Sequence, residues 1–129
     1  MGMEAESLSM DADNDSARTC LEIAVLPGGD GVQRLTLAGE IDLSTANQVR
    51  EHLAAITDGG GERIELDLGG IGYCDSTGLH VLNEARLLCV GRSGWLRVVN
   101  PSDQVARLLE VSGLAGELLA APPGLAHDG

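Results

Sequence analysis

The feature that most constrains the fold of this chain is a repeated change in its hydrophobic period. Short segments in which every second residue is apolar, a pattern typical of half-buried strands, alternate with longer segments in which apolar residues recur every three or four positions, as in amphipathic helices. In chain order the pattern predicts strand, strand, helix, strand, helix, strand, helix and strand. Strands separated by helices favour parallel crossover connections, so we expect an α/β fold.

The strand bounds follow from the turn residues between the periodic segments. The expected strands are Thr19–Leu26, Val32–Ala38, Glu62–Leu68, Trp95–Val99 and Glu117–Ala121. Pro27–Gly31 predicts a turn, which makes the first two strands an antiparallel hairpin in an otherwise parallel, mixed sheet. Gly69–Asp75 is expected to be a loop that approaches the second helix.

The helices are expected at Ser44–Ile56, at Ser76–Arg92, and in a third segment that Ser102 caps and Gly113 ends. The first helix carries the pattern of a capping box, because Thr45 is followed three residues later by Gln48.

Charged residues inside the strands indicate how the helices are distributed. Parallel strands covered on both faces normally read as unbroken apolar runs. Here Glu65 and Asp67 interrupt one strand, and Arg97 interrupts another. We therefore expect a small sheet with helices mainly on one face and with its other face at least partly in water.

The length of 129 residues fits one domain. Residues 1–18 are polar and acidic without periodicity, which predicts a disordered tail. The folded domain is expected to span residues 19–121, and residues 122–129 to be a frayed end.

Charge and residue usage exclude several classes of function. A formal net charge of −12 disfavours nucleic acid and anionic membrane surfaces as partners. The chain has no lysine, which a P-loop nucleotide site and a Schiff-base enzyme both require. Its three cysteines lack the spacing of a zinc site or a disulfide framework, so we expect reduced thiols, no metal or cofactor, and a cytoplasmic protein.

The strongest functional candidate is Ser76, at the expected start of the second helix. Asp75 or Ser76 could cap this helix, whose first turn carries a partial positive charge and free N–H groups. A phosphate on Ser76 would be tolerated there and would add about −1.5 to −2 charges to an acidic surface. From spacing alone, a plain capping role for this segment remains the alternative.

Hydrolytic catalysis is not expected at this serine. A nucleophile elbow requires glycine two residues before the serine, where Cys74 stands. Nothing else in the chain assembles a nucleophile, a base and an orienting group, so the sequence indicates a protein that is not an enzyme.

Four sequence blocks resemble the STAS family, and in particular its bacterial anti-sigma factor antagonists. The family's aspartate-serine-serine/threonine-glycine-leucine motif is similar to Asp75–Leu79. The other blocks are Gly39–Asp42 followed by Ser44–Ala46, then Ile64–Leu68, and finally Val105–Gly113. The resemblance covers roughly residues 19–120 and implies the STAS fold.

The resemblance implies a binding switch. It implies phosphorylation at Ser76, or as second choice at Thr77, by the partner itself, an anti-sigma factor with a Bergerat-type ATPase fold. The unphosphorylated protein would bind that partner and free a sigma factor, and a serine phosphatase would reset the switch. The expected partner-binding residues are Asp42, Ser44, Thr45, Asp75, Ser76, Thr77, Gly78 and His80.

Alternatives remain open for the function and for single residues. The same fold could serve as a regulatory subunit of a transporter or lipid-transport complex, or as a small-molecule or nucleotide sensor. Asp42 could be only a turn or cap residue, and His80 only a solvent-exposed helix residue. Cys74 could sense oxidation, although a thiol at a strand end is more often buried and inert.

Overall fold

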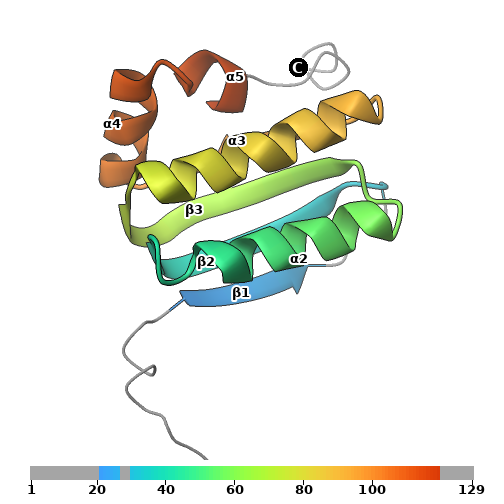
Figure 1. The fold of residues 1–129 in the computed structure, drawn as a ribbon, viewed down its shortest axis with the longest axis horizontal. Helices are drawn as coiled ribbons and strands as arrows, with labels where there is room; N and C mark the ends of the chain where they lie inside the picture. The colour runs from blue at the N-terminus through green and yellow to red at the C-terminus, as the bar shows by residue number, and fades with distance from the viewer. Residues whose placement is uncertain (1–20, 27–29, 120–129) are drawn as a thin grey trace, which may run out of the picture.

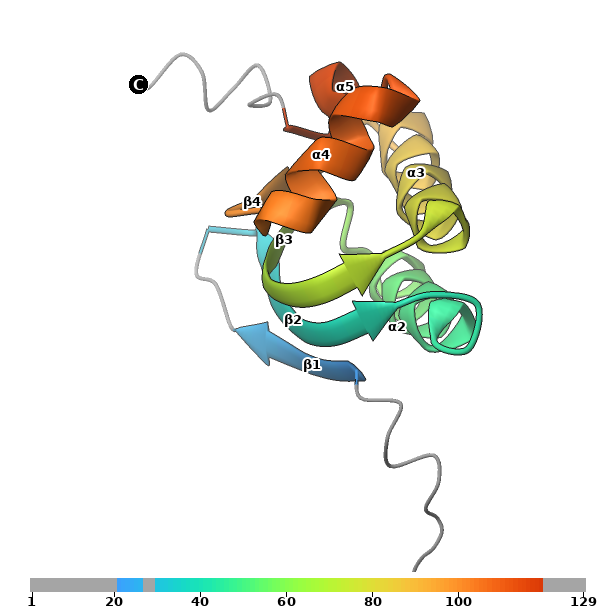
Figure 2. The same cartoon turned by 90° about the vertical axis from the view of Figure 1, so that its left-hand side faces the viewer.

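The computed structural model describes residues 21–26 and 30–119. Its elements are β1 (Leu21–Leu26), β2 (Gln33–Ile41), α2 (Ala46–Asp58), β3 (Arg63–Cys74), α3 (Ser76–Gly91), β4 (Trp95–Val99), α4 (Asp103–Ser112) and α5 (Ala115–Leu119). The described strands form a 4-stranded sheet in the order β1-β2-β3-β4. Figure 1 shows β1, β2 and β3 side by side, and Figure 2 shows β4 beside β3. β1 is antiparallel to β2 and the other pairs are parallel, which confirms the mixed sheet expected from the sequence.

The helices lie mainly on one side of the sheet. α2 and α3 lie side by side against one face, α4 lies against the end of β3, and α5 lies beside β4 (Figure 2). The core between these layers is built almost wholly from aliphatic side chains. The largest of the fully buried ones are Leu35, Leu37, Ile41, Ile64, Leu66, Leu68, Ile71, Leu82, Leu96, Leu109, Leu118 and Val49.

A ladder of charges crosses the other face of the sheet. Arg34, Glu65 and Arg97 stand directly opposite one another on β2, β3 and β4. Glu65 Oε1 lies 3.2 Å from Arg34 Nε, and Oε2 lies 2.9 Å from Arg97 Nη2. Glu65 and Arg97, two of the charged residues that interrupt the strand pattern, thus pair across strands, and the third, Asp67, accepts hydrogen bonds from the Gly69 N–H and from Asn100 Nδ2.

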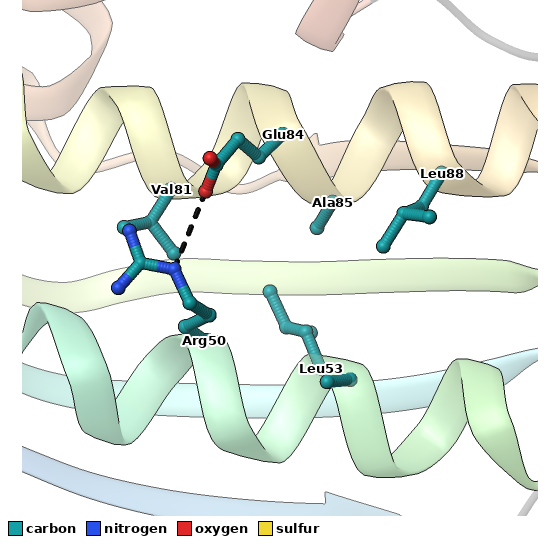
Figure 3. Close-up of a pocket in the computed structure, with 7 residues that line it drawn as sticks. Arg50, Leu53, Val81, Glu84, Ala85 and Leu88 are labelled. Atoms are coloured by element: carbon teal, nitrogen blue, oxygen red, sulfur yellow. Dashed lines mark hydrogen bonds and ion pairs between the residues drawn. The ribbon is translucent and has the colours of Figure 1, made fainter.

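A shallow groove of about 370 Å³ separates α2 from α3 (Figure 3). Its lining is mostly apolar, and an ion pair between Arg50 Nε and Glu84 Oε1 spans it at 3.4 Å. Both side chains are about half exposed, so the pair contributes little, roughly 0.2–1 kcal/mol. The buried side chains of Leu53 on α2 and of Val81 and Ala85 on α3, which all line the groove, contribute more to the stability of this helix pair.

Two expected elements differ from the structure. The loop expected at Gly69–Asp75 is wrong, since β3 continues to Cys74 and stays paired with β2, which itself runs on to Ile41. Gly69, Gly70 and Gly72 interrupt the apolar alternation of this segment, but its backbone groups still pair with β2, and the strand therefore continues. The strand expected at Glu117–Ala121 is also wrong where it is described, because residues through Leu119 form α5 and bury Leu118 in the core.

The expected tails at residues 1–18 and 122–129 lie outside the described residues, as does most of the Pro27–Gly31 turn. Among the described helices, none combines the length and apolar character needed to traverse a bilayer.

Candidate functional site

The candidate site lies where β2 and β3 end side by side. Ile41 and Cys74 are register partners at the carboxyl ends of these parallel strands, and the Asp75 N–H donates to the Ile41 carbonyl at 3.1 Å. The next residues along each strand, Asp42 and Asp75, therefore emerge at the same edge. Both line a surface hollow of about 430 Å³ with Leu43, Ser44 and Tyr73.

Asp75 is the N-cap of α3, and Ser76 is the first helical residue. Asp75 has an extended backbone, and its Oδ1 accepts a hydrogen bond of 3.0 Å from the Gly78 N–H. The Ser76 side chain is exposed, whereas Thr77 is half-buried. Of the two residues that could cap this helix, Asp75 does so, and Ser76 is presented to solvent.

Gly78 lets α3 begin directly on the end of β2. A β-carbon at this position would lie 2.6 Å from Ile41 Cγ2 and 2.7 Å from the Ile41 carbonyl oxygen. Contacts this short do not occur without movement of the backbone. The glycine of the motif is therefore a packing requirement that fixes the height of Ser76 above the sheet.

The turn after β2 is held by hydrogen bonds between its own residues. Asp42 Oδ1 accepts from the Ser44 hydroxyl at 2.7 Å and from the Ser44 N–H at 2.9 Å. The hydroxyl bond is the main reason why the pKa of Asp42 is lowered. Asp42 is therefore a charged residue whose side chain is held in place, and its hydrogen bonds to Ser44 also stabilise the turn.

The capping box expected at Thr45 is wrong. The Thr45 hydroxyl donates to the Glu40 carbonyl at 2.9 Å and accepts from the Asp42 N–H at 3.0 Å, so it does not cap α2. The Gln48 side chain donates instead to the Leu21 carbonyl at 3.3 Å. Thr45 is only 1% exposed, because its hydroxyl lies beneath the turn and hydrogen-bonds to the backbone of Glu40 and Asp42.

Two apolar side chains border the hollow, and neither was among the residues expected from the sequence. Leu43, which follows Asp42, is 79% exposed, and Tyr73, two residues before Asp75, is 47% exposed. The sequence signal that identifies these two positions is a large apolar residue near a strand end, close to the polar residues of a motif. Together with Asp42 and Asp75 they form what we call the switch surface, defined as Asp42, Leu43, Ser44, Tyr73, Asp75 and Ser76.

The structure divides the expected partner-binding residues into surface and supporting positions. His80 is exposed and stands four residues after Ser76, on the same face of α3. Gly78 and Thr45 are buried, so they shape the site from below. The groove between α2 and α3 contains none of the expected site residues.

Cys74 lies beneath the site as an unreactive thiol. It is 1% exposed, and burial, followed by the charges of Asp75 and Asp42, raises its pKa to about 12. Since the thiolate is the reactive form, this environment disfavours the oxidation-sensing alternative. In residues 21–26 and 30–119, no three metal-ligating side chains lie close enough together to hold an ion.

Comparison with known proteins agrees with this geometry. A family model described as "Mlab, STAS domain" matches residues 26–120. The anti-sigma-B factor antagonist of Bacillus subtilis is 32% identical over 81 residues, which are 63% of this chain and 73% of that protein. The protein of the same name from Listeria monocytogenes is 38% identical over 79 residues, 61% of this chain and 69% of the relative.

Solved structures share the fold. The anti-sigma factor antagonist SpoIIAA in its unphosphorylated form matches with a TM-score of 0.67 at 22% identity, over 83% of this chain and 94% of that one. An anti-sigma factor antagonist from Mycobacterium paratuberculosis matches with a TM-score of 0.67 at 24% identity, over 83% and 92% of the two chains. The match to residues 26–120 spans most of the described fold, and this chain belongs to the STAS domain family.

Proposed function

We propose that this protein is an anti-sigma factor antagonist that binds its anti-sigma factor through the switch surface and is released when Ser76 is phosphorylated. The observation that carries the proposal is an exposed serine at the first position of α3, flanked by fixed carboxylates and by two exposed apolar side chains. Relatives named anti-sigma-B factor antagonist, at 32% and 38% identity, support the same function.

Binding of the unphosphorylated protein would combine apolar and charged contacts. Leu43 and Tyr73 offer apolar area that is exposed in the free protein and would be buried by a partner. Asp42 and Asp75 would face cationic groups of the partner, which fixes the register of the complex. The partner would be an anti-sigma factor with a Bergerat-type ATPase fold, and the interaction would take place in the cytoplasm.

Phosphorylation would act on the interface and leave the fold intact. The helix N-terminus offsets part of the phosphate charge, so the folded state tolerates it. The partner, in contrast, would meet about −1.5 to −2 additional charges next to Asp75, together with added bulk where the two surfaces touch. A serine phosphatase would then restore binding.

The proposal is tested with Ser76→Ala and Ser76→Asp in pull-downs from the native host, with phosphosite mapping on the same samples. Ser76→Ala should retain the ATPase-fold partner constitutively, and Ser76→Asp should lose it while its free energy of unfolding changes by less than about 1 kcal/mol. Ser93→Asp is the matched control, because Ser93 is exposed beyond the opposite end of α3 and should leave binding unchanged.

Retention of the partner by Ser76→Asp, or its absence from Ser76→Ala that is folded, would refute the switch. Capture of membrane-transport components with an unmodified Ser76 would favour the transporter-subunit alternative. In that case Asp75 and Ser76 would serve only to start α3.

A further inference from the structure

The last part of β3 extends beyond its neighbour β4. β4 pairs with β3 only as far as Asp67, and the Ser102 N–H then donates to the Leu68 carbonyl at 3.3 Å. After this point the chain leaves the sheet to form α4. The end of β3 therefore lacks a described strand on the side away from β2, although it leads directly to the switch surface.

A side chain from α4 takes the place of the missing strand. The Cys74 N–H donates to Gln104 Oε1 at 2.7 Å, and Gln104 Nε2 donates to the Cys74 carbonyl at 2.9 Å. A carboxamide carries the same donor and acceptor pair as a backbone peptide, so Gln104 completes the sheet at this residue. The two groups are 30 residues apart in sequence.

The backbone that leads to Ser76 is thus held from both sides. On one side Ile41 pairs with Cys74 and accepts from the Asp75 N–H, and on the other side Gln104 holds Cys74. Gln104 itself stands on a well-anchored helix, because Val105 is only 1% exposed and its N–H is capped by Ser102 Oγ at 3.3 Å.

We infer that Gln104 is a positioning residue for the Ser76 hydroxyl, an inference that rests on the proposed function because Ser76 is there the phosphate acceptor. In the transfer, a bond forms between Ser76 Oγ and the γ-phosphorus of ATP as the bond to the bridging oxygen breaks. ADP leaves, and the hydroxyl proton passes to a base of the kinase. Such in-line transfer depends on where the acceptor oxygen stands.

The first test replaces Gln104 with methionine, which has a similar shape and lacks both hydrogen bonds. Gln48→Met is the matched control, since it removes one amide-to-backbone bond on β1. The kinase in this assay is the ATPase-fold protein that Ser76→Ala retains in the pull-down. With Gln104→Met as its substrate, kcat for phosphorylation should be roughly ten- to a hundredfold lower than with the wild type, with little change in KM. Equal values of kcat for Gln104→Met and Gln48→Met would overturn the inference.

The second test needs no kinase and uses Gln104→Glu. A carboxylate still accepts from the Cys74 N–H but repels the Cys74 carbonyl, whereas a protonated carboxyl donates to that carbonyl as the amide does. The backbone amide NMR signals of Asp75 and Ser76 in this variant are compared with those of the wild type at the same pH. The difference should become smaller as the pH falls through the pKa of the new carboxyl group. In Gln104→Met these signals should be shifted at every pH.

The two tests separate the inference from the proposed function. If no ATPase retained in the pull-down phosphorylates the wild-type protein, the kinase-dependent part of the proposed function is refuted. The NMR test alone would then decide the role of Gln104. Amide signals of Asp75 and Ser76 that match the wild type in both Gln104 variants would overturn the inference.

Discussion

At the scale of single residues, the two carboxylates beside Ser76 have different structural duties. Asp75 caps α3 through the Gly78 N–H, whereas Asp42 holds its own turn through Ser44. Neither side chain has to become ordered when a partner arrives, because intramolecular hydrogen bonds already fix both. Such preorganisation reduces the entropic cost of binding.

The Cys74 thiol beneath them predicts a specific pH dependence of stability. Its pKa is raised from 9.0 to about 12, so between these values the unfolded state loses the proton while the folded state keeps it. The free energy of unfolding should therefore be unaffected by this group below pH 9 and should fall above it, by up to about 1.4 kcal/mol per pH unit.

Urea unfolding at a series of pH values from 8 to 10.5 checks this, with Cys74→Ala as the control. The variant is expected to start from a lower stability because it leaves a cavity. Its loss of stability with rising pH should nevertheless be shallower than that of the wild type. Parallel curves for the two proteins would contradict the assigned environment of this thiol.

Residue patterns predicted some of these positions and missed others. Ser76, Asp75 and Asp42 are visible because they lie in short motifs at the ends of periodic segments. Gln104 could not be predicted, since its partner lies 30 residues away and the contact exists only because α4 crosses the end of β3.

At the scale of elements, the height of α3 above the sheet depends on one glycine. Gly78→Ala should lower the free energy of unfolding by about 1–3 kcal/mol, because its methyl group would press on Ile41. Gly91→Ala is the matched control within the same helix, since a β-carbon there meets no atom within 4 Å. It should be neutral or stabilising by up to about 1 kcal/mol.

Thermal and chemical unfolding of the two variants measure this difference. Equal stabilities would mean that α3 can rise from the sheet at no cost. In that case the motif glycine would have no packing role.

The order of elements could be predicted because hydrophobic period separates strands from helices over long segments. Trp95–Val99 agrees with β4 to the residue. The extension of β3 could not be predicted, because it depends on pairing with β2 rather than on its own glycine-rich residues. The sequence predicts a strand where α5 lies because five residues are too few to distinguish the helical period from the strand period.

At the scale of the whole molecule, the charged ladder of Arg34, Glu65 and Arg97 and the switch surface occupy different regions. We expect the ladder to stabilise the fold, whereas the switch surface is the proposed binding site. Glu65, with its side chain only 14% exposed, holds arginines from two neighbouring strands. Glu65→Gln should therefore lower the free energy of unfolding by about 1–3 kcal/mol, because part of each arginine loses its acceptor.

Glu84→Gln is the control, since it removes an exposed pair with Arg50 and should change stability by less than about 0.5 kcal/mol. Urea titrations of the two variants compare them directly. A larger loss of stability at Glu84 than at Glu65 would mean that burial does not strengthen the ladder relative to an exposed ion pair.

The residues of the ladder, together with Asp30, also neutralise one another. Asp30 and Glu65 balance Arg34 and Arg97, so these four residues together carry no net charge. The acidic residues of the switch surface have no such counterpart among the described ion pairs, and their field extends into solvent. A partner with a cationic face, as proposed above, would be attracted to Asp42 and Asp75 at the end of the molecule that carries Ser76, and its rate of association would fall as salt shortens the range of that attraction.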